Sequence, residues 1–174
     1  MRALAERADV ALMTLYNRFG NKDDLILLSL EELLGELNER ADASGKQGIE
    51  FIVHSASLTA DQILATPRYA QAMALMLFNG QIGSPIVNAL LAGNVTQNHA
   101  RVHQMVDLGE LTNEVDTSLL ARSLSTCTWS TILLWMKGLI EDTAFKQEYQ
   151  RAPLLVLASS MSSKTRSKYR TALR

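Results

Sequence analysis

Apolar side chains recur every three or four residues along most of the chain, and strict alternation of apolar and polar residues is nearly absent. One stripe comprises Ile26, Leu30, Leu33 and Leu37, with glutamates supplying much of the opposite side. A period of 3.6 residues is typical of amphipathic α-helices, whereas strands alternate with a period of two. The pattern therefore predicts an all-α protein.

Breakers and capping residues divide the chain into the expected helices. Asn21 followed by Asp24 is close to a capping box, and Asp116 or Thr117 is a candidate N-cap for a later helix. Pro67 suits a first helical turn, whereas Pro153 should kink or restart the last helix. The expected helices span residues 2–8, 12–19, 22–40, 49–65, 67–79, 85–108, 117–140 and about 143–162, and residues 41–48 form a linker.

Composition narrows the class of protein. A length of 174 residues with 47% hydrophobic residues is enough to bury a core. The apolar runs are far shorter than the roughly 20 residues of a membrane-spanning helix, so we expect no membrane partner. Cys127 is the single cysteine, which excludes an internal disulfide. The first residues are too charged for a signal peptide, so we expect a cytoplasmic protein.

The charge distribution is uneven, although the net charge is only −1. Residues 1–22 carry four cations and two anions, whereas residues 23–142 carry six cations and fifteen anions. An acidic body with a basic front can place one face against phosphate while the rest repels it. The basic segment 164–174 is interpreted as a hydrated tail.

The two short helices at the front are joined by a tight turn at Asp9 and Val10. We expect Leu4, Ala5 and Ala8 to face inward and to be closed by Leu15 and Phe19 of the second helix. Such a helix-turn-helix can place its second helix in the major groove of DNA, although two-helix hairpins are also common structural elements. The residues expected to face outward are Ala11, Leu12, Met13, Thr14, Tyr16, Asn17 and Arg18, followed by Lys22 as an anion clamp at the next helix.

The same stretch, LAERADVALMTLYNRFGNKDDL, resembles the DNA-binding domain of TetR-family transcriptional regulators. The resemblance implies that Thr14, Tyr16 and Lys22 contact phosphates, while residues 11–17 read bases. It also implies a homodimeric repressor that releases double-stranded operator DNA on binding a small-molecule effector. Residues 1–40 would then be the DNA-binding domain with its connecting helix, and residues 41–174 the effector-binding and dimerisation domain.

Three departures from the family pattern matter. Asp9 replaces the usual turn glycine, and Ala11 replaces the usual Ser or Thr cap, which weakens the start of that helix. The family also places a further helix and a basic arm before the position of Arg2. Without that first helix, Leu4, Leu15 and Phe19 should be more exposed, and we expect weak DNA binding by residues 1–174.

An effector pocket is expected in the second domain, because apolar cavities with a few polar groups hold small molecules. His54, Asn79 and His103 are the candidate polar selectors. The alternative for the apolar candidates is plain core, because methionines and aromatics at helical spacing are common there. The candidate lining residues are Tyr69, Met73, Met76, Phe78, Met105, Trp129 and Trp135, together with those three polar side chains.

Neither a metal nor a cofactor is expected. His99 and His103 lie four residues apart, but no carboxylate cluster accompanies them, and an exposed polar face explains the pair. Cys127 is interpreted as a small buried apolar residue. Glycine-rich phosphate loops, nucleophile elbows and CxxC motifs are absent from the sequence, so we do not expect an enzyme. The remaining alternative is a helical interaction or ligand-binding protein without DNA-binding activity.

The helix expected at residues 117–140 is apolar on more than one side, so it needs cover on more than one side. Pairing with a symmetry mate, together with the last helix, would form a four-helix interface. We expect Leu134, Leu139 and Leu155 in that interface, and Gly138 to allow a close approach of helices.

Overall fold

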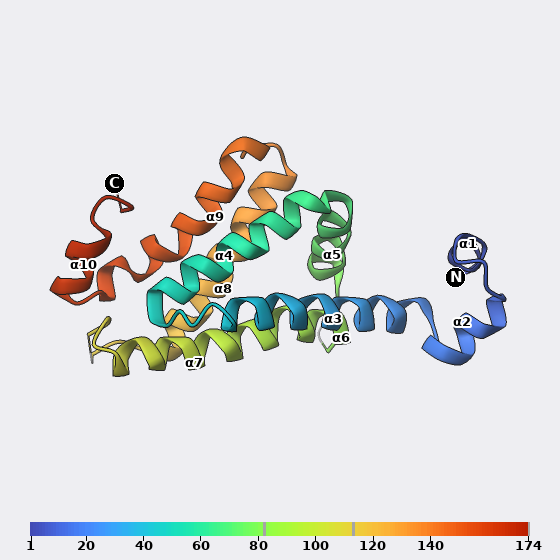
Figure 1. The fold of residues 1–174 in the computed structure, drawn as a ribbon, viewed down its shortest axis with the longest axis horizontal. Coiled ribbons are helices and arrows are strands. Elements are labelled where there is room, and N and C mark those ends of the chain that lie inside the picture. Colours follow the sequence, from blue (N-terminus) through green and yellow to red (C-terminus); the bar gives the residue numbers. More distant parts are fainter. Residues whose placement is uncertain (82, 113, 174) are drawn as a thin grey trace. The chain divides into compact units, whose positions relative to one another are not determined.

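The fold is all-helical in the computed structural model, which describes residues 1–81, 83–112 and 114–173, and the backbone alone of Leu4 (Figure 1). These residues contain no strand; an isolated antiparallel bridge pairs Leu111 with Met161. The prediction of an all-α protein is confirmed. The helices are α1 (Arg2–Arg7), α2 (Leu12–Phe19), α3 (Lys22–Asp42), α4 (Gly48–Ala65), α5 (Pro67–Asn79), α6 (Pro85–Val87), α7 (Gly93–Asp107), α8 (Thr117–Met136), α9 (Asp142–Leu157) and α10 (Ser163–Tyr169).

The chain divides into two compact units, and the division falls inside α3. The N-terminal unit is Met1–Glu36 and the C-terminal unit is Leu37–Arg174. None of the helices among the described residues is long and apolar enough to cross a bilayer.

In the N-terminal unit, α1 and α2 are joined by a turn centred on Asp9, whose φ is 52°. Few residue types other than glycine tolerate this left-handed conformation, and aspartate is one of them. The Val10 N–H donates to the Ala5 carbonyl at 3.1 Å and closes the turn. Ala5 is buried, but Ala8 is exposed, so its predicted inward orientation is wrong. The reason is that α1 ends at Arg7, which leaves Ala8 in the turn.

The start of α3 is held by the predicted reciprocal cap. Asn21 Oδ1 accepts hydrogen bonds from the N–H groups of Asp23 and Asp24 at 2.8 and 3.0 Å. In return, the Asn21 N–H donates to Asp24 Oδ2 at 3.2 Å. This satisfies donors that have no partner within the first helical turn, and it places two carboxylates at the positive end of the helix dipole.

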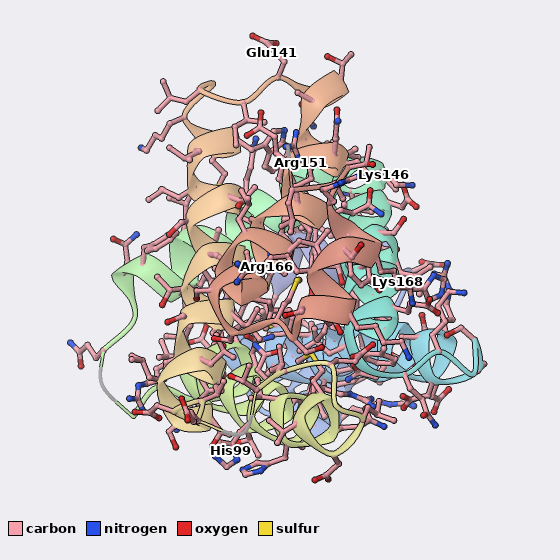
Figure 2. All side chains as sticks on the ribbon, turned by 90° about the vertical axis from the view of Figure 1, so that its left-hand side faces the viewer. His99, Glu141, Lys146, Arg151, Arg166 and Lys168 are labelled. Carbon is pink, nitrogen blue, oxygen red and sulfur yellow. The ribbon has the colours of Figure 1, made fainter. Side chains whose placement is uncertain are left out.

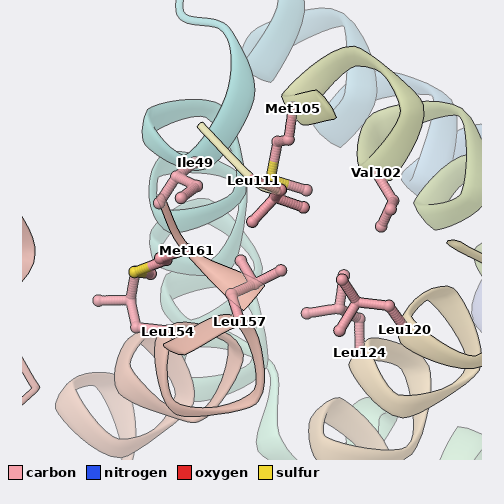
Figure 3. Packing of buried hydrophobic residues seen from close by; sticks show 9 residues of the cluster. All are labelled: Ile49, Val102, Met105, Leu111, Leu120, Leu124, Leu154, Leu157 and Met161. Atoms are coloured by element: carbon pink, nitrogen blue, oxygen red, sulfur yellow. The ribbon is translucent and has the colours of Figure 1, made fainter. Parts of the chain in front are cut away.

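The C-terminal unit is built around α4, α7, α8 and α9. Helices α8 and α9 are neighbours, α4 packs on α9, and α7 packs on α8. One core cluster joins residues from α4, α7, α8 and α9 with the segments that follow α7 and α9 (Figure 3). Its members are Ile49, Val102, Met105, Leu111, Leu120, Leu124, Leu154, Leu157 and Met161. The second cluster contains Ile132 and Trp135 of α8 with Phe145 and Tyr149 of α9, so α8 and α9 run antiparallel.

The turn between α8 and α9 is set by Gly138, whose φ is 70°. Its N–H donates to the Trp135 carbonyl, and the Leu139 N–H donates to the Leu134 carbonyl, both at 2.9 Å. These two bonds form a Schellman motif, which ends α8 at Met136 instead of Ile140. Gly138 thus lies beyond the helix in which the sequence placed it, and within this chain no side chain packs where its Cβ would be; its role in a close approach of two copies stays a prediction.

Two other helices differ in detail from the expectations. The helix expected over residues 85–108 contains a π-helical segment, Asn88–Ala92, between α6 and α7. Helix α9 continues through Pro153 to Leu157, so of the kink or restart expected at the proline, the restart does not occur. Asp116 caps α8 as predicted, with its Oδ1 accepting from the Leu119 N–H at 2.9 Å.

The start of α4 depends on a residue far away in the sequence. Glu110 Oε2 accepts a hydrogen bond from the Ile49 N–H at 2.8 Å. Gly48 has a φ of 55°, and a Cβ there would collide with the Glu110 carboxylate. Glycine is thus required for two reasons, its backbone conformation and the close approach of the cap.

The basic segment at the end of the chain is not simply hydrated, which corrects the sequence interpretation. Thr165 is buried, and Tyr169, Ala172 and Leu173 pack against the first core cluster. The cations of α10 remain on the outer side, where Lys168 Nζ lies 2.7 Å from Glu50 Oε1 of α4. Lys168 and Lys146 both point outward on the side of this unit where α4 runs (Figure 2).

Replacing Phe145 with alanine should destabilise the C-terminal unit strongly. Phe145 is fully buried, and its ring lies 5.1 Å from that of Trp135 and 5.3 Å from that of Tyr149. Loss of such a side chain costs about 3–5 kcal/mol of unfolding free energy. Phe78→Ala is the matched control, because Phe78 is 49% exposed. Urea denaturation measures the free energy of unfolding. An equal loss of unfolding free energy in the two variants would contradict the packing of α9 described above.

Replacing Lys168 with alanine should raise the pKa of Glu50 toward its ordinary value. The hydrogen bond from Lys168 and its charge lower the pKa of this carboxyl. The pair therefore stabilises the fold above the ordinary pKa of Glu, and this contribution is lost as the pH falls through the lowered pKa. Carboxyl NMR titration measures the change. Lys146→Ala is the control, because Lys146 pairs with Asp61 instead, and an equal shift of Glu50 in both variants would contradict the docking of α10 on α4.

Candidate functional site

The outward face of α2 is the first candidate site. Met13 is 67% exposed and Tyr16 45% exposed, and α2 has no fully buried side chain. The inner side of α2 is formed by half-buried residues at helical spacing, Leu12, Leu15 and Phe19. The prediction that Leu12 faces outward is therefore wrong. The other predicted DNA-contacting residues are exposed, namely Ala11, Met13, Thr14, Tyr16, Asn17, Arg18 and Lys22.

The ends of α2 follow the sequence expectations. Ala11 stands at the N-cap and provides no side-chain hydrogen bond, as predicted. At the other end, the guanidinium carbon of Arg18 lies 5.6 Å from the centroid of the Phe19 ring. This cation–π contact keeps a positive charge at the C-terminal end of α2, where the helix dipole favours it.

Lys22 differs from its predicted setting. The prediction places it beside free backbone N–H groups that could hold an anion together with its ammonium. Two of those N–H groups, from Asp23 and Asp24, are occupied by Asn21. The exposed ammonium of Lys22 can still attract phosphate, but the neighbouring carboxylates weaken that attraction.

A cavity of about 310 Å³ in the C-terminal unit is the second candidate site. Its wall is formed by the end of α3 and by α4, α7, α8 and α9. Apolar and polar side chains contribute to it in similar measure. The lining residues are Asn38, Asp42, Phe51, Ile52, Ser55, Ala56, Thr59, Asn94, Gln97, Asn98, Ala100, Arg101, Leu124, Thr128, Tyr149 and Pro153.

Two charged side chains line this cavity, and they pair with each other. One terminal nitrogen of Arg101 lies 2.8 Å from Asp42 Oδ1, and its guanidinium carbon lies 3.7 Å from the centroid of the Phe51 ring. A partly exposed ion pair adds little stability. Its effect is geometric, because the carboxylate and the ring together fix the plane of the guanidinium.

The neutral polar groups of the wall are partly ordered by hydrogen bonds. Asn98 Nδ2 donates to Asn94 Oδ1 at 3.2 Å and to Ser125 Oγ at 3.0 Å. Thr128 Oγ1 donates to the Leu124 carbonyl at 3.0 Å. Burial raises the pKa of Tyr149, so its phenol stays protonated and neutral at physiological pH. The cavity wall therefore carries no net charge.

The pocket residues proposed from the sequence lie elsewhere, and none of them lines this cavity. Met73 and Met105 are buried, Phe78 and His103 are exposed, and the polar atoms of Tyr69 and Trp129 are buried without a partner among the described residues. Met76 and His54 are half-buried, Asn79 is exposed, and Trp135 belongs to the second core cluster.

The sequence feature that corresponds to this cavity is a polar stripe. Asn94, Gln97, Asn98 and Arg101 form a stripe at helical spacing on α7, and sequence reasoning missed it because it searched for apolar and aromatic residues. A stripe of amides on a helix ordinarily indicates a solvent-exposed face. Only the helices packed around α7 turn that face into a wall.

The side chains considered for metal binding or reactivity have structural surroundings. The rings of His99 and His103 lie 4.6 Å apart, and His99, near Ser118, is seen at the surface in Figure 2. In the part of the chain that the structure describes, no three His, Cys, Asp or Glu side chains gather as a metal site would require. Burial raises the pKa of the Cys127 thiol to about 11, which disfavours the reactive thiolate.

The three residues predicted for a dimer interface are exposed apolar side chains. Leu134 is 42%, Leu139 72% and Leu155 54% exposed. Helices α8 and α9 bury their other sides in the two core clusters. Leu134 lies on α8, Leu139 in the turn that follows and Leu155 near the end of α9, so each is available for contact with another chain.

No family model matches the chain, and no curated protein or solved structure matches it either. The functional interpretation therefore rests on the exposed face of α2 and on the cavity of the C-terminal unit.

Proposed function

We propose that this chain is a DNA-binding transcriptional regulator of the TetR type, with α2 as the helix that enters the major groove. The observation that carries the proposal is the α1–α2 hairpin. Its turn is closed at Asp9, and α2 presents a row of exposed polar and aromatic side chains on a helix with an apolar inner side. The major groove is about 12 Å wide and admits one helix of this kind.

The exposed residues of α2 and of the positions beside it suit three kinds of contact with DNA. The hydroxyls of Thr14 and Tyr16 and the ammonium of Lys22 suit phosphate oxygens, which fix the orientation of a protein on the duplex. Asn17 carries a donor and an acceptor, and Arg18 carries paired donors, and both arrangements recognise base edges in the major groove. Ala11 and Met13 offer apolar surface to a thymine methyl.

The C-terminal unit would supply the regulation. Its cavity is large enough for a small-molecule effector. The exposed leucines of α8 and α9 suit pairing with a second copy, which would present two α2 helices to successive major grooves. An effector that binds better to a state in which the two helices no longer match the grooves releases the DNA, which makes the protein a repressor.

A second candidate function is a helical ligand-binding protein without DNA-binding activity. The cavity favours it, because every lining residue belongs to the C-terminal unit and none belongs to α1 or α2. The two functions differ in whether α2 contacts DNA, which the next experiment measures.

Lys22→Ala and Tyr16→Phe should weaken binding to duplex DNA of any sequence. We expect weak binding by the 174-residue chain that falls steeply as salt rises, and Lys22→Ala should lower the salt slope by about one. Asn17→Ala should instead change the preference between sequences. Fluorescence anisotropy with random duplexes at low and moderate salt measures both effects.

The matched control for this experiment is Lys146→Ala, which removes an exposed cation from the surface of the C-terminal unit. It should leave the salt slope unchanged. A chain that fails to bind DNA even at low salt, or an equal effect of both lysine substitutions, would favour the second candidate function.

Leu134→Glu and Leu155→Glu should convert a homodimer into monomers. Both side chains are exposed, so a charge there leaves the fold of one chain intact but opposes burial in an interface. Interfaces of permanent dimers bury about 2,000 Å² or more. Sedimentation at micromolar concentration measures the change. Leu75→Glu on α5, also exposed, is the control, and a monomeric wild-type chain would refute the dimer.

A further inference from the structure

The polar side of the cavity in the C-terminal unit is concentrated on facing helices. Helix α7 contributes Asn94, Gln97, Asn98 and Arg101, which repeat at helical spacing. Helix α4 contributes the hydroxyls of Ser55 and Thr59, four residues apart. The end of α3 adds Asn38 and Asp42. A ligand in the cavity is therefore met by hydrogen-bonding groups from three helices.

These groups offer donors and acceptors in balanced numbers. Every side-chain amide carries an acceptor oxygen and a donor NH₂ group, and every hydroxyl can act in both roles. The one cationic side chain, Arg101, has its charge offset by Asp42 at 2.8 Å. An anionic ligand would meet the Asp42 carboxylate and a cationic ligand would meet the Arg101 guanidinium, so the wall disfavours both.

The rest of the wall is apolar. Leu124 and Pro153 line it from α8 and α9, and Phe51 and Ile52 line it from α4. The ring of Tyr149 is buried beside them with its neutral phenol. A fitting ligand thus has one apolar face and many hydroxyls at its edge. A sugar ring has this character, because its C–H groups form a face and its hydroxyls surround it.

We propose that this cavity binds a neutral polyhydroxylated ligand of monosaccharide or disaccharide size. Its volume of about 310 Å³ lies at the lower end of small-molecule sites and suits such a ligand. An apolar ligand of the same size offers no hydrogen-bond partner to the half-buried and exposed polar groups of the wall, and a partner of this kind is what gives hydrogen-bonding sites their selectivity. That this ligand is the effector rests on the proposed function; its binding to the cavity does not.

Calorimetric titration of the full chain, without DNA, tests the proposal. The probes are D-glucose, D-galactose, D-mannose, D-ribose, L-arabinose, maltose, sucrose and trehalose, each to about 10 mM, with sodium benzoate and spermidine as anionic and cationic comparisons. At least one sugar should bind in a saturable manner, and more tightly than benzoate and spermidine. Binding by no sugar, or tighter binding of either charged probe, overturns the proposal.

Two near-isosteric variants locate the binding. Thr59→Val and Gln97→Leu each remove a hydrogen-bonding group from the wall while keeping its approximate volume, and each should weaken sugar binding by about tenfold. Gln71→Leu changes an exposed glutamine on α5 and should leave binding unchanged. Thermal unfolding shows that each variant is folded, and if one is not, the other carries the test. Unchanged sugar binding in the folded cavity variants overturns the proposal.

These results are independent of the DNA experiment. Sugar binding that follows the cavity variants stands even if the chain binds no DNA, which would favour the second candidate function. DNA binding with the expected salt slope stands even if no sugar binds, and the effector would then be of another chemical class.

Discussion

The packing of α9 between α4 and α8 is the interaction on which the C-terminal unit depends. Phe145 and Tyr149 near its start belong to the second core cluster, and Leu154 and Leu157 near its end belong to the first. One helix therefore ties both clusters together. The same helix places Tyr149 and Pro153 in the cavity wall, so the core and the candidate ligand site both depend on the position of α9.

The helix ends around α9 fix how the other helices meet it. Gly138 stops α8 and reverses the chain, and Trp135 Nε1 donates to Asp142 Oδ1 at 2.7 Å across that turn. Glu110 caps α4 from the segment after α7, which ties the start of α4 to the end of α7. Because the turn after α8 and the start of α4 are both held in this way, the amides of α7 and the hydroxyls of α4 line one cavity, and apolar residues fill the space around it.

The N-terminal unit has the opposite physical character. Helix α2 buries none of its side chains fully, and its inner side is only half-buried, so little apolar burial holds it in place. Its exposed face is rich in groups that bind phosphates and base edges, while Asp23 and Asp24 keep the local charge moderate. In the proposed regulator, DNA contacts would add to the stability of this hairpin, because a partner that binds only the folded form stabilises it.

The sequence by itself determined the features that depend on residues a few positions apart. The helical period gave the all-α class, Asn21 and Asp24 gave the start of α3, and Asp116 gave the start of α8, because each of these hydrogen bonds closes within three residues. The turn at Asp9 is local as well, because its closing hydrogen bond joins Val10 to Ala5, five residues earlier.

Only the tertiary structure decided which helix faces are covered. It packed Tyr169 of the basic segment against the core, and it made the polar stripe of α7 part of a cavity wall that the spacing of aromatic residues and methionines did not predict. Both outcomes rest on contacts between segments that are far apart in the sequence, as does the cap that Glu110 provides to Ile49. A helical pattern identifies a polar face, but whether that face meets water or a ligand is fixed by the helices that pack around it.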